Sequence, residues 1–413
     1  MRLPVLMIII CYLLLIITDL FIIRDLRIFS LFNKFRSQNK NGGRWWKVFL
    51  VFAVLVLLTL TVAICLPRRS ENNGIIATMW LLYSVLTVEI AQVIYVLCSL
   101  IGVIPVLIKK KRWNTGLWVG LPLSVLFFSM MWWGVLVGRY KIQTNTVTIS
   151  SPKIPATFNG YKIAQISDLH VGTWGNDTTF IHKLVESVNR LNPDLILFTG
   201  DIVNRNSDEL LPFIHTLSQL KAKDGVFSVL GNHDYGDYIS WSSPQAKRAN
   251  LDSLLSYQKR MGWKTLNNTH TGIINEYGDS IVLIGVENWG EPPFSRYGDL
   301  KKAYPQVNTK DSTFKVLMSH NPEHWNQEVS RISDIDLTLA GHTHAMQIMF
   351  QLGNWKWSPS EYKYDQWEGL YSRLNQDGYE TKIYVNIGAG EVGIPMRIGA
   401  TPEITLFILQ DIK

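Results

Sequence analysis

The chain has 413 residues, 47% of them hydrophobic, with a mean hydropathy of +0.08 and a formal net charge of +7. Residues 1–145 hold 16 Lys and Arg against 4 Asp and Glu, so this part carries +12 and the rest of the chain carries −5. Basic residues that flank apolar segments are typical of membrane-protein loops, and an acidic remainder argues against nucleic acid as a partner. The three cysteines, Cys11, Cys65 and Cys98, all lie in apolar stretches, so neither a disulfide framework nor a thiolate zinc site is indicated.

The first 145 residues are predicted to form a transmembrane domain with four helices. A membrane-spanning helix needs roughly 20 mostly apolar residues, and four stretches meet this requirement: residues 4–23, 46–66, 75–108 and 117–137. Lys and Arg are concentrated in the loop 24–47 and at residues 109–112. Such loops usually face the cytoplasm, so we expect a multi-pass protein of the cell (inner) membrane whose C-terminal domain is extracytoplasmic.

Residues 146–160 are predicted to be a linker or an edge strand. Polar and apolar side chains alternate here from Thr146 to Ser150, and Pro152, Pro155 and Gly160 then interrupt the pattern. We place the second domain at residues 161–413.

Strands and helices alternate along this second domain, which indicates an α/β fold. The pattern predicts strands at residues 162–167, 195–199, 226–230, 280–286, 315–318, 335–340, 382–387 and 404–409. It predicts helices at residues 178–191, 208–220 and 245–261. The aromatic-rich segment 352–378 is expected to be a long loop.

Polar side chains follow five of the predicted strands. They are Asp168 with His170, Asp201, Asn232 with His233, His320, and His342 with His344, and they include five of the nine histidines in the chain. Buried polar groups need partners, and a metal ion is a partner that can satisfy many of them at once. The pattern therefore predicts a metal site at the strand ends.

The spacing within these groups adds detail. In extended backbone, residues i and i+2 point to the same side, so Asp168 and His170 can face one site, as can His342 and His344. Asn232 and His233 are neighbours and are expected to point in different directions. Ligands of this kind, without thiolates, suit Mn, Fe or Zn. A carboxylate such as Asp201 can bridge two ions that lie roughly 3.5–4 Å apart.

Taken together, these blocks resemble the calcineurin-like metallophosphoesterase family. The family pattern of D-x-H, G-D, G-N-H-[DE], H and G-H-x-H is present in order over about residues 160–410. The resemblance implies a four-layered αββα sandwich and two divalent metal ions. One would be held by Asp168, His170, Asp201 and His344, and the other by Asp201, Asn232, His320 and His342. It further implies that His233 is the general acid, that Asp234 orients it, and that a metal-bridging hydroxide is the nucleophile.

The blocks at 319–323 and 402–404 resemble the membrane-anchored phosphodiesterase branch of this family, which includes transmembrane proteins with a metallophosphoesterase domain. One departure is the pair Ala345 and Met346, where the branch commonly has two glycines. This departure is expected to reshape the pocket rather than the metal ligands.

The expected function is a membrane-anchored metallophosphoesterase that acts on a phosphomonoester or phosphodiester. The membrane domain favours a lipid substrate. Two alternatives stay open at this point. One is a nucleotide-sugar-lipid pyrophosphatase, and the other is a non-catalytic membrane sensor or scaffold that retains the metal site.

Overall fold

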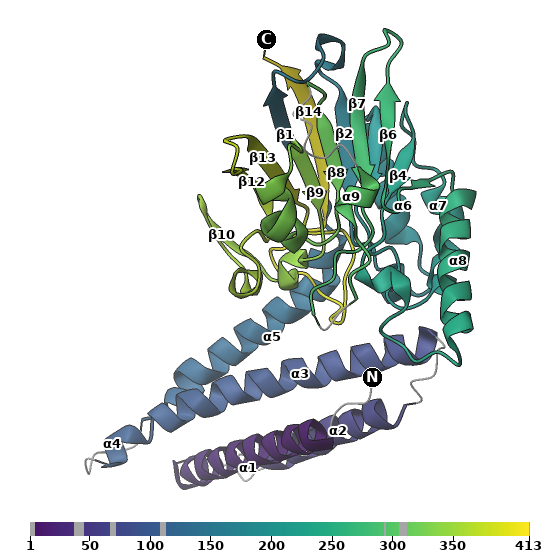
Figure 1. The fold of residues 1–413 in the computed structure, drawn as a ribbon. Helices are drawn as coiled ribbons and strands as arrows, with labels where there is room; N and C mark the ends of the chain where they lie inside the picture. The colour runs from purple at the N-terminus through teal and green to yellow at the C-terminus, as the bar shows by residue number, and fades with distance from the viewer. Residues whose placement is uncertain are drawn as a thin grey trace. The chain divides into compact units, whose positions relative to one another are not determined.

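The computed structural model describes residues 5–36, 45–66, 72–107, 113–292, 295–304 and 312–412. The chain divides into two compact units. The first comprises Met1–Val135 with Gly393–Pro395, and the second comprises Leu136–Val392 with Met396–Lys413. Figure 1 shows the helices and strands of both units, which are described separately below.

The first unit is helical. Its elements are α1 (Val5–Arg36), α2 (Trp45–Cys65), α3 (Asn72–Ile101), α4 (Ile104–Leu107), the π-helical turn η1 (Gly116–Gly120) and α5 (Leu121–Leu136). Within the described residues, three helical stretches are long and apolar enough to cross a membrane: Trp45–Cys65, Gly74–Val106 and Gly116–Tyr140.

The prediction of four spans is therefore corrected to three candidates among the described residues. The predicted first span, residues 4–23, falls almost wholly within α1, which continues through Asp19, Arg24, Asp25 and Arg27 before it ends. Charged side chains in a membrane span are costly, and here they cut short the apolar stretch. Residue 4 and the basic residues 109–112 lie outside the described residues.

Polar side chains join the helices of this unit. Gln92 of α3 accepts a hydrogen bond from Thr18 Oγ1 at 3.1 Å and donates one to Asp19 Oδ1 at 3.0 Å, both on α1. The Tyr83 hydroxyl of α3 donates to the Met131 carbonyl of α5 at 2.9 Å. Such bonds are a common means of helix association where the surroundings are apolar.

The second unit contains two six-stranded sheets. The first has the order β1-β14-β2-β3-β4-β5. Its strands are β1 (Gln143–Ser151), β14 (Glu403–Asp411), β2 (Lys162–Ile166), β3 (Leu195–Phe198), β4 (Val226–Ser228) and β5 (Lys264–Thr265). The strands β2 to β5 run parallel, β14 is antiparallel to β2, and β1 forms the edge in parallel with β14.

The second sheet has the order β12-β13-β9-β8-β7-β6. Its strands are β12 (Gly369–Leu374), β13 (Glu380–Val385), β9 (Leu337–Ala340), β8 (Lys315–Met318), β7 (Ser280–Gly285) and β6 (Thr269–Ile274). The expectation of a long loop over 352–378 is wrong, because this segment contains β11 (Trp355–Trp357), the 3-10 turn η9 (Pro359–Tyr362) and β12. A separate hairpin pairs β11 with β10 (Phe350–Leu352).

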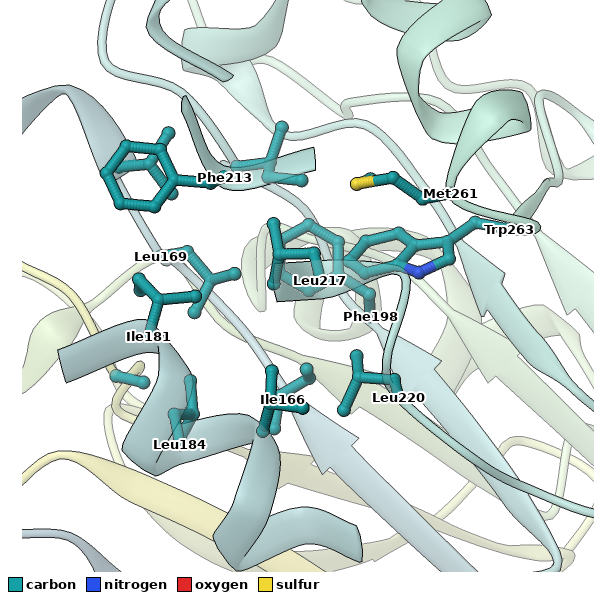
Figure 2. Close-up of a cluster of buried hydrophobic side chains, with 14 of the residues drawn as sticks. Ile166, Leu169, Ile181, Leu184, Phe198, Phe213, Leu217, Leu220, Met261 and Trp263 are labelled. Carbon is teal, nitrogen blue, oxygen red and sulfur yellow. The ribbon is translucent and has the colours of Figure 1, made fainter. Parts of the chain in front are cut away.

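The two faces of each sheet enter different hydrophobic clusters. In β3, Leu195 and Leu197 pack in the cluster that both sheets share, while Ile196 and Phe198 point to the opposite side. That outer side packs against α6 (Thr179–Arg190), and Figure 2 shows Phe198 among the side chains of this cluster. The alternation follows from the two-residue period of a strand. The strand β3 is therefore buried on both faces, and the polar residues lie in the loop that follows it.

Short helices complete the unit. They are η5 (Ser207–Phe213), α7 (Ile214–Leu217), α8 (Pro244–Arg260), α9 (Leu300–Ala303), η7 (Trp325–Val329) and α10 (Ser330–Ile332). The single helix predicted over 208–220 is instead a 3-10 turn followed by one short α-helix. Pro212 lies within the 3-10 turn, and a proline lacks the N–H that a continuous α-helix would require there.

Candidate metal centre

The residues that follow five strands lie together at the carboxyl ends of the two sheets. The strands β2, β3 and β4 are parallel neighbours in one sheet, and β8 and β9 are parallel neighbours in the other. Two hydrogen bonds connect these sheet ends. His320 Nδ1 donates to the Thr199 carbonyl at 2.8 Å, and the His342 backbone N–H donates to the Asp168 carboxylate at 3.0 Å. Carboxyl ends of parallel strands are where α/β proteins generally bind ligands.

One cluster is formed by Asp168, His170 and His344. His344 Nε2 lies 3.3 Å from Asp168 Oδ1 and 3.1 Å from His170 Nε2. All three side chains are buried, and their ligand atoms can reach one point in space. His170 Nε2 also lies 3.6 Å from Asp201 Oδ2, which connects this cluster to its neighbour.

A second cluster surrounds His320 Nε2. This atom lies 3.2 Å from each of Asp201 Oδ2, Asn232 Oδ1 and His342 Nδ1. Because the other ring nitrogen of His320 donates to a carbonyl, Nε2 is the ring nitrogen that faces this cluster. Asp201 is thus placed between the two clusters. The seven residues predicted as metal ligands are all brought together.

The chemistry of this donor set fits a divalent cation. The ligand atoms are imidazole nitrogens, carboxylate oxygens and an amide oxygen, and neighbouring ones lie 3.1–3.6 Å apart. Most of them are hydrogen-bond acceptors, so few protons are available to join them. Burial lowers the pKa of His342 to about 3, reinforced by the neighbouring His320, so this ring is neutral and able to act as a ligand. Burial also lowers the pKa of His320, but the carboxylates of Asp201 and Asp168 outweigh it and raise the value to about 9. The two carboxylates therefore attract positive charge to this point.

The backbone at these positions is left-handed. Asp168, His170, Asp201, His342 and His344 have φ values of 54°, 42°, 59°, 76° and 52°. Positive φ is uncommon for residues other than glycine, and such conformations tend to occur at functional sites. Left-handed backbone therefore brings Asp168 toward His170 and His342 toward His344. The prediction that an extended backbone would direct each pair into the site is wrong.

The same conformation continues past His344. Ala345, Met346 and Gln347 have φ values of 47°, 44° and 60°. Glycine would adopt this backbone without steric cost, so the two non-glycine residues at 345 and 346 are held there by their surroundings. Ser358 Oγ donates to the Ala345 carbonyl at 2.6 Å, and Ala345 is fully buried.

The predicted relation between Asp234 and His233 also needs correction. His233 Nδ1 donates to the Asn204 carbonyl at 2.7 Å, so that carbonyl and not the Asp234 carboxylate is its ring partner. The Asp234 carboxylate instead accepts from the backbone N–H groups of Asp201, Ile202 and Gly231, each at 2.9 Å. Burial, followed by the charge of Asp201, raises the pKa of Asp234 to about 7. Because both oxygens accept N–H groups, the loop is built around the ionised form.

The site also includes two tyrosines, which the spacing of polar residues did not reveal. The Tyr238 hydroxyl accepts from Asn232 Nδ2 at 2.7 Å, and its ring stacks on His233 with centroids 4.1 Å apart. The Tyr364 hydroxyl lies 3.1 Å from His342 Nε2. Tyr364 is part of the aromatic segment noted in the sequence, but nothing there distinguished it from the other aromatic residues.

A cavity of about 290 Å³ opens beside the second cluster. Asn232, His233, Tyr238 and His342 form part of its wall. The predicted acid is therefore placed where a bound molecule could reach both it and the cluster.

Comparison with known proteins agrees with this geometry. Residues 161–346 match the sequence pattern of the family described as calcineurin-like phosphoesterase. A transmembrane protein with metallophosphoesterase domain from Danio rerio is 31% identical over 271 residues, which cover 64% of this chain and 56% of that protein. The metallophosphoesterase YkuE of Bacillus subtilis (strain 168) is 30% identical over 280 residues, covering 66% of this chain and 86% of YkuE. The UDP-2,3-diacylglucosamine pyrophosphatase LpxG of Chlamydia trachomatis is 30% identical over 232 residues, which cover 48% of this chain and 67% of LpxG.

The α/β fold with mixed sheets and the His/Asp clusters at its strand ends agree with these matches. The chain belongs to the calcineurin-like phosphoesterase family. The predicted resemblance, including that to the transmembrane proteins of the family, is confirmed. The chain spans only slightly more than half the length of the Danio rerio relative.

Proposed function

We propose that the whole chain is a membrane-anchored phosphoesterase that holds two divalent metal ions and hydrolyses a phosphomonoester or phosphodiester. The observation that carries this proposal is the position of Asp201, whose carboxylate lies 3.6 Å from His170 Nε2 and 3.2 Å from His320 Nε2. A carboxylate between two such clusters is the arrangement used to bridge two ions.

The proposed ligands follow the two clusters. Asp168, His170, Asp201 and His344 would hold one ion, and Asp201, Asn232, His320 and His342 would hold the other. Divalent ions bound there would supply positive charge to the phosphoryl oxygens and would lower the pKa of water. The identity of the ions is limited by the nitrogen and oxygen ligands to the Mn, Fe or Zn class.

His233 would act as the general acid. Its Nδ1 is held by the Asn204 carbonyl, which leaves Nε2 as the nitrogen for proton transfer. As the bond between phosphorus and the leaving oxygen breaks, a proton on Nε2 can be transferred to that oxygen. Asp234 supports this step indirectly, because it holds the backbone of the loop that ends at Asn204.

A hydrolysis screen tests the proposal. Detergent-purified protein with manganese is expected to hydrolyse members of a panel of lipid, nucleotide and sugar phosphates. Released phosphate is measured directly for monoesters and after an added phosphatase for diesters, with His233→Ala as the blank. Absence of turnover in protein that has two ions bound would reject the proposal in favour of a non-catalytic sensor or scaffold.

A lipid-linked substrate is the class we favour. Three helical stretches are apolar enough to cross a membrane, and one relative, LpxG, is named as a UDP-2,3-diacylglucosamine pyrophosphatase. The same relative supports the second candidate function, a nucleotide-sugar-lipid pyrophosphatase. Release of a nucleoside monophosphate from a nucleotide-sugar lipid would favour that candidate over a simple phosphomonoesterase or phosphodiesterase.

The side of the membrane separates these candidates further. The distribution of Lys and Arg supports an extracytoplasmic catalytic domain in the cell (inner) membrane. A reporter that is active only outside the cytoplasm, fused after Lys413, is expected to be active. Activity of a cytoplasmic reporter at the same position would contradict this orientation and favour the pyrophosphatase, since nucleotide-linked substrates are usually cytoplasmic.

Tyr238 should tune the second ion without binding it. Its hydroxyl holds the Asn232 amide so that Oδ1 faces His320, and burial raises its pKa to about 12, which keeps the hydroxyl protonated at neutral pH. Loss of a partner of this kind typically costs roughly 10–100-fold in metal affinity. We therefore expect Tyr238→Phe, which keeps the ring on His233, to raise the half-activating manganese concentration by about tenfold.

The matched control is Tyr362→Phe, because Tyr362 is 82% exposed and forms no part of the cavity wall. Its half-activating manganese concentration should equal that of the parent protein. An unchanged value in Tyr238→Phe would show that the Asn232 amide is oriented without the hydroxyl.

A further inference from the structure

The β10–β11 hairpin is a feature that the proposed catalytic chemistry does not use. It forms a two-stranded sheet of its own, and within the part of the chain that the structure describes neither strand joins a six-stranded sheet. Figure 1 shows β10 apart from those sheets. A single two-stranded hairpin is only marginally stable in water. A further surface to pack against would therefore stabilise it.

One face of this hairpin is apolar. Phe350 is paired directly with Trp357, and Leu352 is paired directly with Trp355. Directly opposed side chains of an antiparallel pair lie on the same face, and so do residues two apart in one strand. The four apolar side chains therefore share a face. The Phe350 and Trp357 rings stack on it with their centroids 5.9 Å apart.

This apolar face is largely exposed. Leu352 is 80% exposed, Trp355 is 59% exposed and Phe350 is 40% exposed. The opposite face of the hairpin carries the polar pair Gln351 and Lys356. Single exposed apolar residues are ordinary on protein surfaces, but several of them gathered on one face indicate an interaction site. The hairpin is thus amphipathic, with its apolar face available to a partner.

The base of the hairpin is connected to the end of a candidate membrane span, Gly116–Tyr140. Arg139, next to the last residue of this span, forms an ion pair with Glu391 at 3.0 Å. The residue after Glu391, Val392, donates its backbone N–H to Gln347 Oε1 at 2.7 Å. Arg139, Glu391, Val392 and Gln347 all belong to the second unit, so these contacts lie within one compact body.

A short backbone ladder continues from Gln347 to the hairpin. The Ile398 N–H donates to the Gln347 carbonyl at 2.9 Å, and the Met349 N–H donates to the Ile398 carbonyl at 2.8 Å. Phe350, which follows Met349, is the first residue of β10. An unbroken series of contacts therefore joins the end of the span to the start of the hairpin.

The composition of the apolar face indicates its partner. Trp side chains are enriched where a membrane meets water, and amphipathic surfaces that carry Trp, Phe and Leu lie in this interface. We propose that the β10–β11 hairpin docks its face of Phe350, Leu352 and Trp355 on the lipid bilayer that the chain itself spans. This docking rests on the membrane anchoring proposed above and does not depend on catalysis.

Docking would place the metal centre at the bilayer surface. The stretch 345–349 joins His344, a proposed metal ligand, to Phe350, and its first three residues have the left-handed backbone described above. The Ser358 hydroxyl, just after β11, binds the Ala345 carbonyl at 2.6 Å. The hairpin is thus tied at both of its ends to the segment that carries His344. A docked hairpin therefore holds this segment close to the surface at which a lipid-linked substrate is presented.

Fluorescence of the labelled full-length chain in lipid vesicles tests the docking. In a background with Cys11, Cys65 and Cys98 replaced by alanine, Leu352→Cys is labelled with a nitrobenzoxadiazole dye and reconstituted in phosphatidylcholine vesicles. An interfacial apolar face lies roughly 5–10 Å into the boundary between head groups and acyl chains, so nitroxide groups on the upper acyl chains should quench about half of the emission or more.

The matched control is Tyr277→Cys in the same background. Tyr277 is 72% exposed in the turn between β6 and β7. This turn is at the amino end of β7, and the metal clusters follow the carboxyl ends of the neighbouring parallel strands, so the dye at 277 should not be quenched. Trp355→Glu, added to Leu352→Cys, should remove most of the quenching at 352, because a carboxylate directly opposite is costly to insert.

Three results would overturn the docking. They are equal quenching at 352 and 277, quenching at 352 that Trp355→Glu leaves unchanged, and a dye at 352 with blue-shifted emission that the nitroxide lipids do not quench. The second would show that the dye and not the apolar face enters the bilayer, and the third would show that protein covers the hairpin. A chain that alkaline carbonate removes from the vesicles would instead reject the membrane anchoring itself, and the docking with it.

Discussion

Replacement of Asp201 by asparagine is expected to lower phosphoesterase activity by at least about 100-fold and to reduce the bound metal from two ions to one or none. The carboxylate lies between the two clusters, at 3.6 Å from His170 Nε2 and 3.2 Å from His320 Nε2. Both distances are to Oδ2. An amide has nearly the same shape as the carboxylate, but it carries no charge, so its oxygen is a much weaker bridge between two cations. The bound metal is measured by elemental analysis. The activity of the variant and of the parent protein is measured against one phosphate ester that the parent hydrolyses.

The matched control is Asp252→Asn on the exposed face of α8, which makes the same chemical change far from the strand ends. It should keep both ions and full activity. Asp201 Oδ1 also accepts from the His233 backbone N–H at 2.8 Å, a bond that the asparagine can retain through its oxygen. A loss of metal in Asp201→Asn could therefore not be attributed to a collapsed loop, and normal metal content would reject the bridging role.

The second large effect is expected for His233→Ala, in which kcat should fall by about 10²–10⁴ while both ions stay bound. His233 lines the cavity, and its Nδ1 is tied to the Asn204 carbonyl. The loss should depend on the leaving group. An alkyl alcohol is a poor leaving group and needs the proton, whereas p-nitrophenolate departs without it, so the variant should be impaired most on alkyl esters.

His215→Ala is the control for this comparison, since His215 is exposed on α7 and its ring bonds to the side chain of Gln219. Its rates should match those of the parent on both esters. An equal loss of activity on alkyl and p-nitrophenyl substrates in His233→Ala would contradict the role of general acid and would point to a role in binding the phosphoryl group.

Asp234 explains why these two residues are expected to behave as a unit. Its carboxylate accepts N–H groups from Asp201 and Ile202 on one loop and from Gly231 on the next. The first loop carries the Asp201 carboxylate, which we propose bridges two ions, and leads to the carbonyl that binds His233. The second loop carries Asn232 and His233 themselves. One buried side chain thus fixes the distance between the metal ligands and the acid.

The positions of the strands that carry the site, and the polar groups that follow them, could be predicted from the sequence. A strand has a two-residue period, and β3 alternates between two cores, so its apolar run and its abrupt end at Gly200 and Asp201 are visible locally. The membrane segments were visible for a similar reason, because composition alone defines them. The first predicted span is not among the candidates within the described residues, because Asp19, Arg24 and Asp25 fall inside the described part of α1.

The segment over 352–378 shows where local pattern was insufficient. Its many aromatic and turn residues suggested a loop, but β12 is an edge strand whose pairing with β13 is decided by the rest of the sheet. Edge strands carry a weaker local signal, because one of their sides faces no neighbour. The same segment delivers Tyr364 to His342, a contact between residues 22 positions apart that periodicity does not encode.

By itself, the sequence determined which residues are available for metal and proton chemistry, because their types and their positions after apolar strands are local properties. Only the tertiary structure decided how they meet. The left-handed turns at Asp168, His170, Asp201, His342 and His344 turn the side chains toward a common point, and such turns persist only when surrounding contacts hold them. The Asn204 carbonyl and the Tyr238 hydroxyl join the site for the same reason. Their roles depend on which loop lies beside them, and the packing of two sheets sets that arrangement.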